Sequence, residues 1–169
     1  ADFLQHAIEH LDADARYSDP DLSPVEHPGA IHQAAREKVH TLLHDLVHDE
    51  AEIDRWLGQY LTRPPRGQQA WPRERPVSPE AVVETLEDGV GLRRGPVSRL
   101  AFIEHDDGSA TLFANGEPRP LDADLAYAAP VVTGREVLPA DRLTPHLDDE
   151  AFVELLCSLL NDGLLELDA

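Results

Sequence analysis

Residues 28–61 read PGAIHQAAREKVHTLLHDLVHDEAEIDRWLGQYL, the longest stretch of this 169-residue chain with a clear hydrophobic period. Its apolar residues recur three or four positions apart, which places them on one stripe of an α-helix. Asp49 and Glu50 then supply two acids of the kind that suit a helix N-terminus. The stretch therefore predicts two consecutive helices, or one bent helix.

A pair of helices is too narrow to bury its own apolar stripe, so other helices, from this chain or from a partner, must cover it. We therefore interpret the stripe as an association surface. Its members are Ile31, Ala35, Val39, Leu42, Leu46, Ile53 and Leu57.

The formal net charge of −19 is spread unevenly along the chain. The segment up to Thr62 has 13 acids against 4 bases, residues 63–121 have 9 against 8, and the remainder has 11 against 2. A field of that sign repels phosphate backbones and anionic lipid surfaces. The charge therefore argues against nucleic-acid and membrane partners and favours basic ones.

A chain of this length makes one large domain or two small ones. Its single cysteine, Cys157, has no partner for an intramolecular disulfide, which fits a reducing compartment. No stretch has the length and flanks of a signal peptide or a membrane span, so we expect a cytoplasmic protein. The chain starts with Ala-Asp-Phe-Leu and contains no methionine, which we interpret as a fragment of a longer parent.

The composition predicts three regions: helices in residues 1–62, a linker rich in proline and arginine in residues 63–77, and an α/β domain in residues 78–169. The arginines of the linker, together with Trp71, could contact RNA. Pairing with the acidic flanks is the interpretation that the charge distribution favours. These arginines are Arg63, Arg66, Arg73 and Arg75.

The third region begins with a helix that Ser78 caps, with Pro79 in its first turn and Gly89 after its end. Strands, tight turns and further helices follow, with a two-residue turn at Asn115-Gly116. The expected elements are β-prone runs at 92–104 and 110–114, helices near 122–128, 139–143 and 148–160, and a closing strand at 164–167. That order is typical of a winged helix. The predicted fold class is α+β, with a helical region followed by a small winged-helix-like domain.

Winged helices often bind DNA through a helix that presents basic or amide side chains. The corresponding segment here, residues 148–161, reads DDEAFVELLCSLLN and would expose Asp149, Glu150 and Glu154. Because these acids would repel DNA, we favour a protein-contact or structural role for the domain.

Two motifs have spacings that are known from metal sites. His10 with Asp12, and His146 with Asp148, show the His-x-Asp spacing of iron oxygenases, but the first pair ends a helix and Asp148 suits a helix N-cap. Three histidines spaced by four could bind zinc, although a solvated polar face explains them without a metal. They are His40, His44 and His48. We therefore predict no catalytic, cofactor-binding or metal-binding residue in this chain.

Five segments, taken in order, resemble one protein family. They are YSDPD at 17–21, HPG at 27–29, DRWLGQYLTRPP at 54–65, LFANGEPRPL at 112–121 and LLCSLLNDGLLEL at 155–167. The set is similar to the C-terminal half of bacterial cupin-type JmjC ribosomal oxygenases, which depend on Fe(II) and 2-oxoglutarate. The members it resembles most are ribosomal protein arginine hydroxylases.

The resemblance implies a cupin barrel that holds the iron and 2-oxoglutarate, followed by a helical dimerisation region and a winged-helix domain. Only the last two match this chain, so the resemblance transfers no catalytic residue to it and places the barrel elsewhere in the parent. It does imply that the helices in residues 31–61 form a homodimer, in agreement with the association surface. It also implies a basic ribosomal protein as the parent's substrate, which the acidic charge fits.

Two other functions are compatible with the sequence. One is a nucleic-acid-binding winged-helix regulator with a helical dimer arm, which predicts salt-dependent binding to DNA or RNA. The other is a histidine-rich metal module built on the three spaced histidines.

Overall fold

The structure, a computed structural model, describes residues 33–168 except for the side chains of Ala35, Leu42, Leu43, Asp45, Leu46 and Val47. The first His-x-Asp pair, the helix that it was expected to end, and Ile31 lie outside the described residues. The chain divides into two compact units between Trp56 and Leu57.

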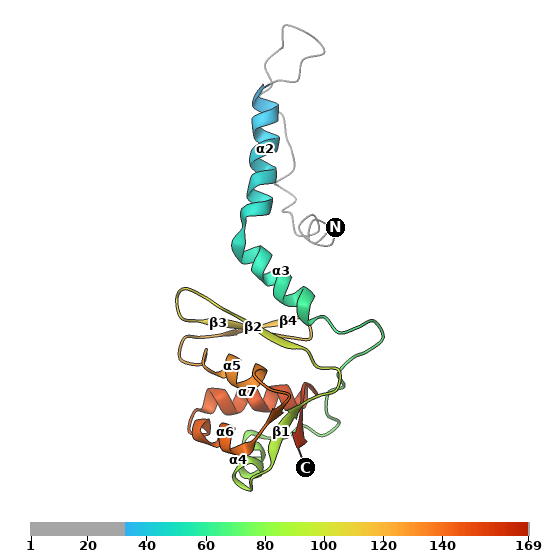
Figure 1. Cartoon of the computed structure of the whole chain (residues 1–169), viewed down its shortest axis with the longest axis vertical. Coiled ribbons are helices and arrows are strands. Elements are labelled where there is room, and N and C mark those ends of the chain that lie inside the picture. The colour runs from blue at the N-terminus through green and yellow to red at the C-terminus, as the bar shows by residue number, and fades with distance from the viewer. Residues whose placement is uncertain (1–32, 169) are drawn as a thin grey trace. The chain divides into compact units, whose positions relative to one another are not determined.

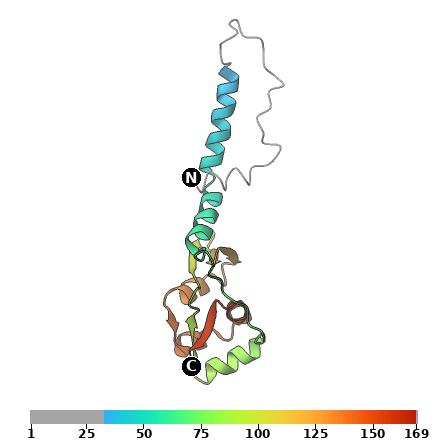
Figure 2. The same ribbon diagram turned by 90° about the vertical axis from the view of Figure 1, so that its right-hand side faces the viewer.

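Two successive helices carry the periodic stretch, drawn from blue to teal in Figure 1 and Figure 2. They are α2 (Gln33–His48) and α3 (Glu50–Thr62). Asp49 separates them, and its carboxylate accepts a hydrogen bond from the backbone N–H of Glu52 at 3.1 Å. Because Asp49 caps α3 and acids follow in the first turn, the predicted break at this position is confirmed.

The second unit contains short helices and strands that alternate along the chain. In order they are α4 (Pro79–Glu87), β1 (Gly91–Arg94), β2 (Leu100–Glu104), β3 (Ala110–Ala114), β4 (Glu117–Leu121), α5 (Ala128–Thr133), β5 (Val137–Leu138), α6 (Ala140–Leu143), the 3₁₀ turn η2 (Thr144–His146), α7 (Glu150–Asn161) and β6 (Leu165–Asp168). The predicted α+β class is confirmed, and residues 33–168 contain no closed barrel.

The strands form two separate antiparallel sheets, with the orders β5-β1-β6 and β2-β3-β4. The β-prone run at 92–104 therefore supplies strands to both sheets. A turn separates them, in which the Ser98 N–H donates to the carbonyl of Gly95 at 3.0 Å. Gly95 itself donates to the carbonyl of Leu164 at 2.9 Å, and a Cβ on it would come within 2.7 Å of the Gly163 carbonyl. This close approach ends β1 and redirects the chain.

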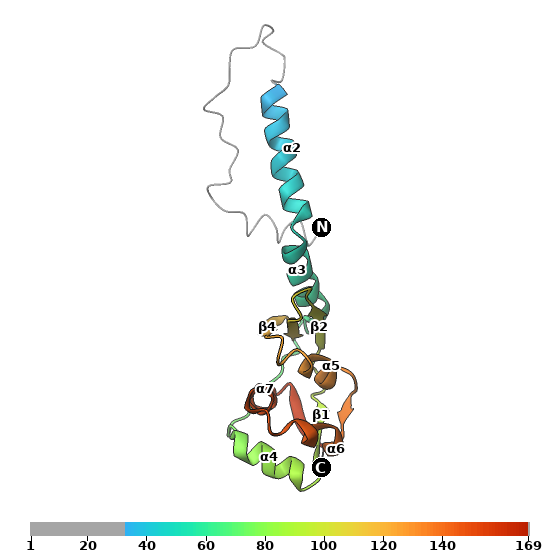
Figure 3. The same cartoon turned by 90° about the vertical axis from the view of Figure 1, so that its left-hand side faces the viewer.

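Helix α7 lies at the centre of this unit, between α4 and the β2-β3-β4 sheet (Figure 1, Figure 3). It buries seven of its twelve residues, and α4 contributes Val82 and Leu86 to the same core. Burial of each such side chain stabilises the fold by about 1.5–3 kcal/mol. The core thus joins the helical trio α4, α6 and α7 to both sheets.

Local capping follows the sequence at α4 and differs from it at α7. The Ser78 hydroxyl accepts from the Ala81 N–H at 3.3 Å, which confirms the predicted cap of α4. At α7 the N-cap is Asp149, not Asp148, because the carboxylate of Asp149 accepts from the backbone of Ala151 and Phe152. The helix expected over 122–128 is also wrong, since turns occupy this stretch and α5 begins at its end.

Candidate functional site

The predicted association stripe lies on α2 and α3, and the structure describes only part of it. Val39 is 40 % exposed and Leu57 is 39 % exposed, while Ile53 is half-buried. Ala35, Leu42 and Leu46 lie within α2. The role of this stripe as an interface stays a prediction.

Helix α3 exposes two more large apolar side chains beside Leu57. Tyr60 is 44 % exposed and Leu61 is 58 % exposed. Positions three and four residues apart share one side of a helix, so Leu57, Tyr60 and Leu61 form a continuous apolar face. We call these three residues the α3 apolar face. Tyr60 and Leu61 are not members of the stripe predicted from the sequence, although the four-residue step from Leu57 pointed to Leu61.

Another side of α3 is anchored to the β2-β3-β4 sheet. Gly58 lies against the ring of Phe113, and the Thr62 hydroxyl accepts from the N–H of Gly116 at 3.0 Å while donating to the Gly58 carbonyl at 2.8 Å. Gly116 belongs to the turn after β3, where Asn115 has a φ of 51° and Gly116 a φ of 90°. Positive φ at both positions fits the predicted two-residue turn. The anchor fixes the C-terminal half of α3 while its apolar face stays exposed.

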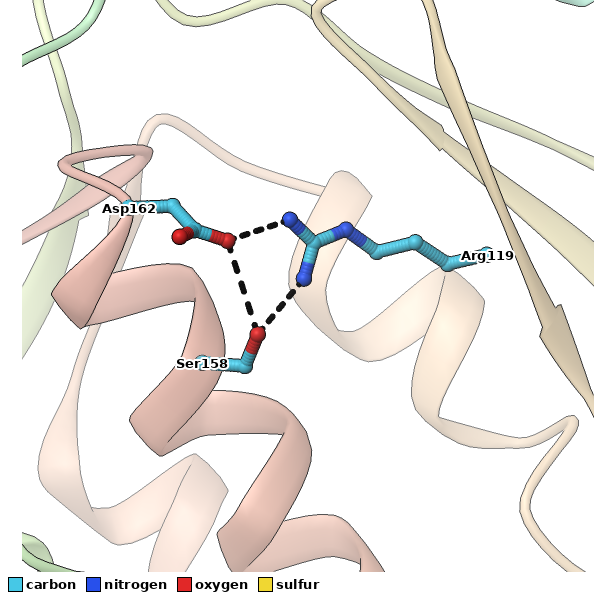
Figure 4. Close-up of polar contacts among 3 residues, drawn as sticks. All are labelled: Arg119, Ser158 and Asp162. Atoms are coloured by element: carbon cyan, nitrogen blue, oxygen red, sulfur yellow. Dashed lines mark hydrogen bonds and ion pairs between the residues drawn. The ribbon is translucent and has the colours of Figure 1, made fainter. Parts of the chain in front are cut away.

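A polar cluster joins β4 to the C-terminal end of α7 (Figure 4). The guanidinium of Arg119 donates through Nη1 to the Ser158 hydroxyl at 2.7 Å and through Nη2 to the Asp162 carboxylate. The cluster borders a pocket of about 530 Å³ that linker residues Gln68 and Gln69 also line. A cation near a helix C-terminus is favoured by the helix dipole. The cluster holds the sheet on the helix, and its groups satisfy one another instead of activating a nucleophile.

A second polar cluster lies at the start of α7. The Tyr127 hydroxyl donates to the Asp149 carboxylate at 2.7 Å. Burial, followed by this hydrogen bond and the charge of Asp149, raises the pKa of Tyr127 to about 12. The Tyr127 hydroxyl in turn is the main cause that lowers the pKa of Asp149. His146 packs its ring against Tyr127 and Phe152, at 4.9 and 5.3 Å between ring centroids, so it serves as an aromatic contact.

The spaced histidines are exposed along α2. The rings of His44 and His48 are stacked at 3.8 Å, and His48 Nδ1 lies 2.8 Å from the carbonyl oxygen of His44. Among the side chains that the structure describes, which do not include Asp45, no three of His, Cys, Asp or Glu come together as metal ligands. The described part of the chain therefore offers no ligand set for the zinc hypothesis.

The linker is held by main-chain contacts. Arg73 donates its backbone N–H to the carbonyl of Asn161 at 2.8 Å. The side chain of Asn161 accepts from the Val77 N–H at 2.8 Å and donates to the Val77 carbonyl at 3.1 Å. Arginine side chains of the linker are exposed, and none of them forms an ion pair with another described residue. The expected pairing of these arginines with the acidic flanks is therefore absent among residues 33–168.

The described helices include none that is long and apolar enough to cross a membrane.

Comparison with known proteins adds three findings. The ROXA-like winged helix family matches residues 42–166. The ribosomal protein uL16 3-hydroxylase of Escherichia coli K12 is 26 % identical over 147 residues, which cover 87 % of this chain and 38 % of that protein. A solved structure of YcfD, a ribosomal oxygenase from E. coli, aligns with a TM-score of 0.76 at 22 % identity, over 99 % of this chain and 44 % of that one.

A second YcfD structure, in complex with cobalt and 2-oxoglutarate, aligns with a TM-score of 0.75 at 22 % identity, again over 99 % and 44 % of the two chains. The chain thus spans less than half the length of these relatives. At this identity the structural likeness supports the fold alone.

Proposed function

This chain belongs to the ROXA-like winged helix family, and from that premise we propose that it is the non-catalytic association and winged-helix part of a 2-oxoglutarate- and Fe(II)-dependent hydroxylase acting on a ribosomal protein. The observation that carries the proposal is the collinear match to a relative named as a uL16 3-hydroxylase, over most of this chain but a minority of the relative. The modified residue of the substrate is proposed to be an arginine, as the family resemblance implies.

The iron and 2-oxoglutarate are assigned to a part of the parent outside this chain. Non-haem iron oxygenases hold their metal with two histidines and a carboxylate that face one another. The described side chains bring no such group together, so the described part does not fit the metal. We therefore assign no step of the hydroxylation to it.

The role we propose for the helices is homodimerisation through the predicted stripe, extended by Tyr60 and Leu61. Support comes from the exposure of Val39 on α2 and of the α3 apolar face. Each large apolar side chain that a partner buries contributes about 1.5–3 kcal/mol before the cost of association. The acidic charge of the chain would favour encounter with a basic ribosomal protein.

The nucleic-acid alternative is weakened by the placement of α7. A recognition helix must present a free face to a groove. Helix α7 buries seven of its twelve residues, and the residues that it exposes are Glu150, Ala151 and Glu154. Acids at these positions oppose a phosphate backbone.

Light scattering of the full 169-residue chain across concentration tests the dimer. We expect a dimer for the unchanged chain and a shift towards monomer for Val39→Glu combined with Leu61→Glu, because buried carboxylates would need desolvation at the interface. Val137→Glu is the matched control, since Val137 is an exposed valine outside the stripe.

A monomer for the unchanged chain at all concentrations would contradict the dimerisation role. A dimer that survives the double change but not the control would move the interface away from α2 and α3.

A further inference from the structure

A second pocket lies on the side of the winged-helix domain formed by α5, β5, α6 and η2. Its volume is about 440 Å³, within the range of pockets that bind specific ligands. Most of its lining is apolar, from Pro130, Val131, Val137, Leu138, Pro139 and Pro145. An apolar side chain of a ligand would fit this surface.

The charged residues that line this pocket are mostly basic, whereas the sequence around them is acidic. From Asp122 to the end of the chain there are 11 acids and only two basic residues, Arg135 and Arg142. Both arginines line the pocket, together with His146 and a single acid, Asp141. Both are exposed, and neither forms an ion pair with another described residue. The two guanidinium groups are therefore available to carboxylates of a ligand.

The strand beside the pocket, β5, is two residues long and is followed by Pro139. β5 pairs with β1 through Leu138 opposite Leu92 and Val137 opposite Arg93, and it lies at the edge of its sheet. Its second edge pairs with no other described strand, and Val137 is exposed. Exposed strand edges bind extended peptides by main-chain hydrogen bonds, with side-chain pockets giving selectivity.

We propose that this pocket binds an extended acidic segment of a partner protein, with one apolar side chain in the pocket and flanking carboxylates on Arg135 and Arg142. Charge complementarity selects this occupant, because a basic segment would meet two arginines at the rim. The partner therefore differs from the basic ribosomal substrate, and the inference is independent of the hydroxylase assignment.

The test is an NMR titration of the ¹⁵N-labelled full chain at low salt with a capped decapeptide of alternating glutamate and valine. We expect saturable shifts of the backbone amides of Val137, Leu138 and Arg142. The variant R135E/R142E should weaken binding at least about tenfold, the scale of one lost charge-assisted hydrogen bond. The control R75E/R99E makes the same charge change at two exposed arginines that line none of the pockets described above.

Two comparison peptides separate this site from other interactions. A peptide with lysine in place of glutamate should not bind, and one with alanine in place of valine should bind at least about tenfold more weakly, because alanine buries less apolar surface in the pocket. Equal weakening by R75E/R99E, equal affinity for the alanine peptide, or no shift of the β5 amides would each overturn the proposal.

Discussion

Gly58 of α3 lies so close to the aromatic ring of Phe113 in β3 that a β-carbon at position 58 would overlap the ring. Phe113 is buried, so its ring cannot swing into solvent to make room. The helix and the sheet therefore meet where only a glycine fits. Glycine is a poor helix former, and its presence in the middle of α3 is explained by this contact.

The first prediction concerns this contact. Gly58→Ala should destabilise the chain by about 1–3 kcal/mol, because overpacking against Phe113 outweighs the gain of up to about 1 kcal/mol in helix propensity. Urea unfolding of both proteins measures the change. Phe113→Leu replaces the ring with a smaller side chain, so in that background Gly58→Ala should lower the free energy of unfolding by much less. A stabilising Gly58→Ala would contradict the packing described.

The second prediction concerns the Arg119 cluster. Arg119→Met should lower the free energy of unfolding by about 1–2 kcal/mol, since it removes hydrogen bonds to Ser158 and Asp162 that are partly shielded from water. Asp162→Asn should cost less in that background than in the unchanged chain, which a double-mutant cycle measures. Arg99→Met is the control, because Arg99 is exposed and has no ion pair with a described residue. Additive costs would show that Arg119 and Asp162 do not stabilise each other.

The third prediction is an acid dependence at Asp149. Its pKa is lowered in the folded chain, so its contribution to stability is present above its ordinary pKa of 3.8 and is lost as the pH falls through the lowered value. Asp149→Asn should therefore flatten the loss of stability on acidification. Denaturant unfolding from pH 2 to pH 7 provides the measurement, and the exposed neighbour Asp148→Asn provides the control. An equal effect of both changes would contradict the role of the Tyr127 hydroxyl.

The fourth prediction is an alkaline dependence of stability at Tyr127. The pKa of Tyr127 rises from 10.0 to about 12 in the folded chain, so the folded state keeps this proton longer than the unfolded state. Its contribution is complete below pH 10 and is lost as the pH rises towards about 12. In Tyr127→Phe this alkaline loss should be smaller, as measured by denaturant unfolding between pH 10 and about pH 12. If Tyr127→Phe leaves the loss of stability at alkaline pH unchanged, the hydroxyl has the same pKa in the folded and the unfolded chain.

The last prediction addresses the nucleic-acid alternative. A labelled 20-base-pair DNA duplex and a single-stranded RNA, titrated at low salt, should bind more weakly than about 100 μM, the weak end of non-specific binding. The physical reason is that α7 exposes the acidic side chains Glu150 and Glu154, which repel phosphate groups. Tight, salt-dependent binding that disappears when all four linker arginines become alanine would contradict this and make the linker a nucleic-acid site.

Features that depend on neighbouring residues were predictable from the sequence. Asp49 between the two helices, Ser78 before α4 and the Asn115-Gly116 turn each act within a few residues, and each is where it was expected. The order of helices and strands that indicated a winged helix depends on the same short-range signals.

Features that depend on distant contacts were not predictable in this way. Asp149 is the N-cap in place of Asp148, and its other carboxylate oxygen accepts from Tyr127, which lies 22 residues earlier. The run at 92–104 breaks because Gly95 approaches the backbone near Gly163, a proximity that no local pattern reveals. The exposure of Tyr60 and Leu61 likewise depends on which side of α3 the sheet covers.

The pair of hydrogen bonds between Asn161 and Val77 joins residues 84 positions apart, one just before α4 and the other at the end of α7. Together with the main-chain hydrogen bond from Arg73 to Asn161, they fasten the linker to the C-terminal end of α7. A force applied to the linker would therefore be transmitted directly to the end of α7, and not through the strands that lie between the two in sequence. Asn161 thus closes a loop between the linker and the end of α7, and Asn161→Ala would remove both side-chain bonds while keeping the main-chain bond from Arg73.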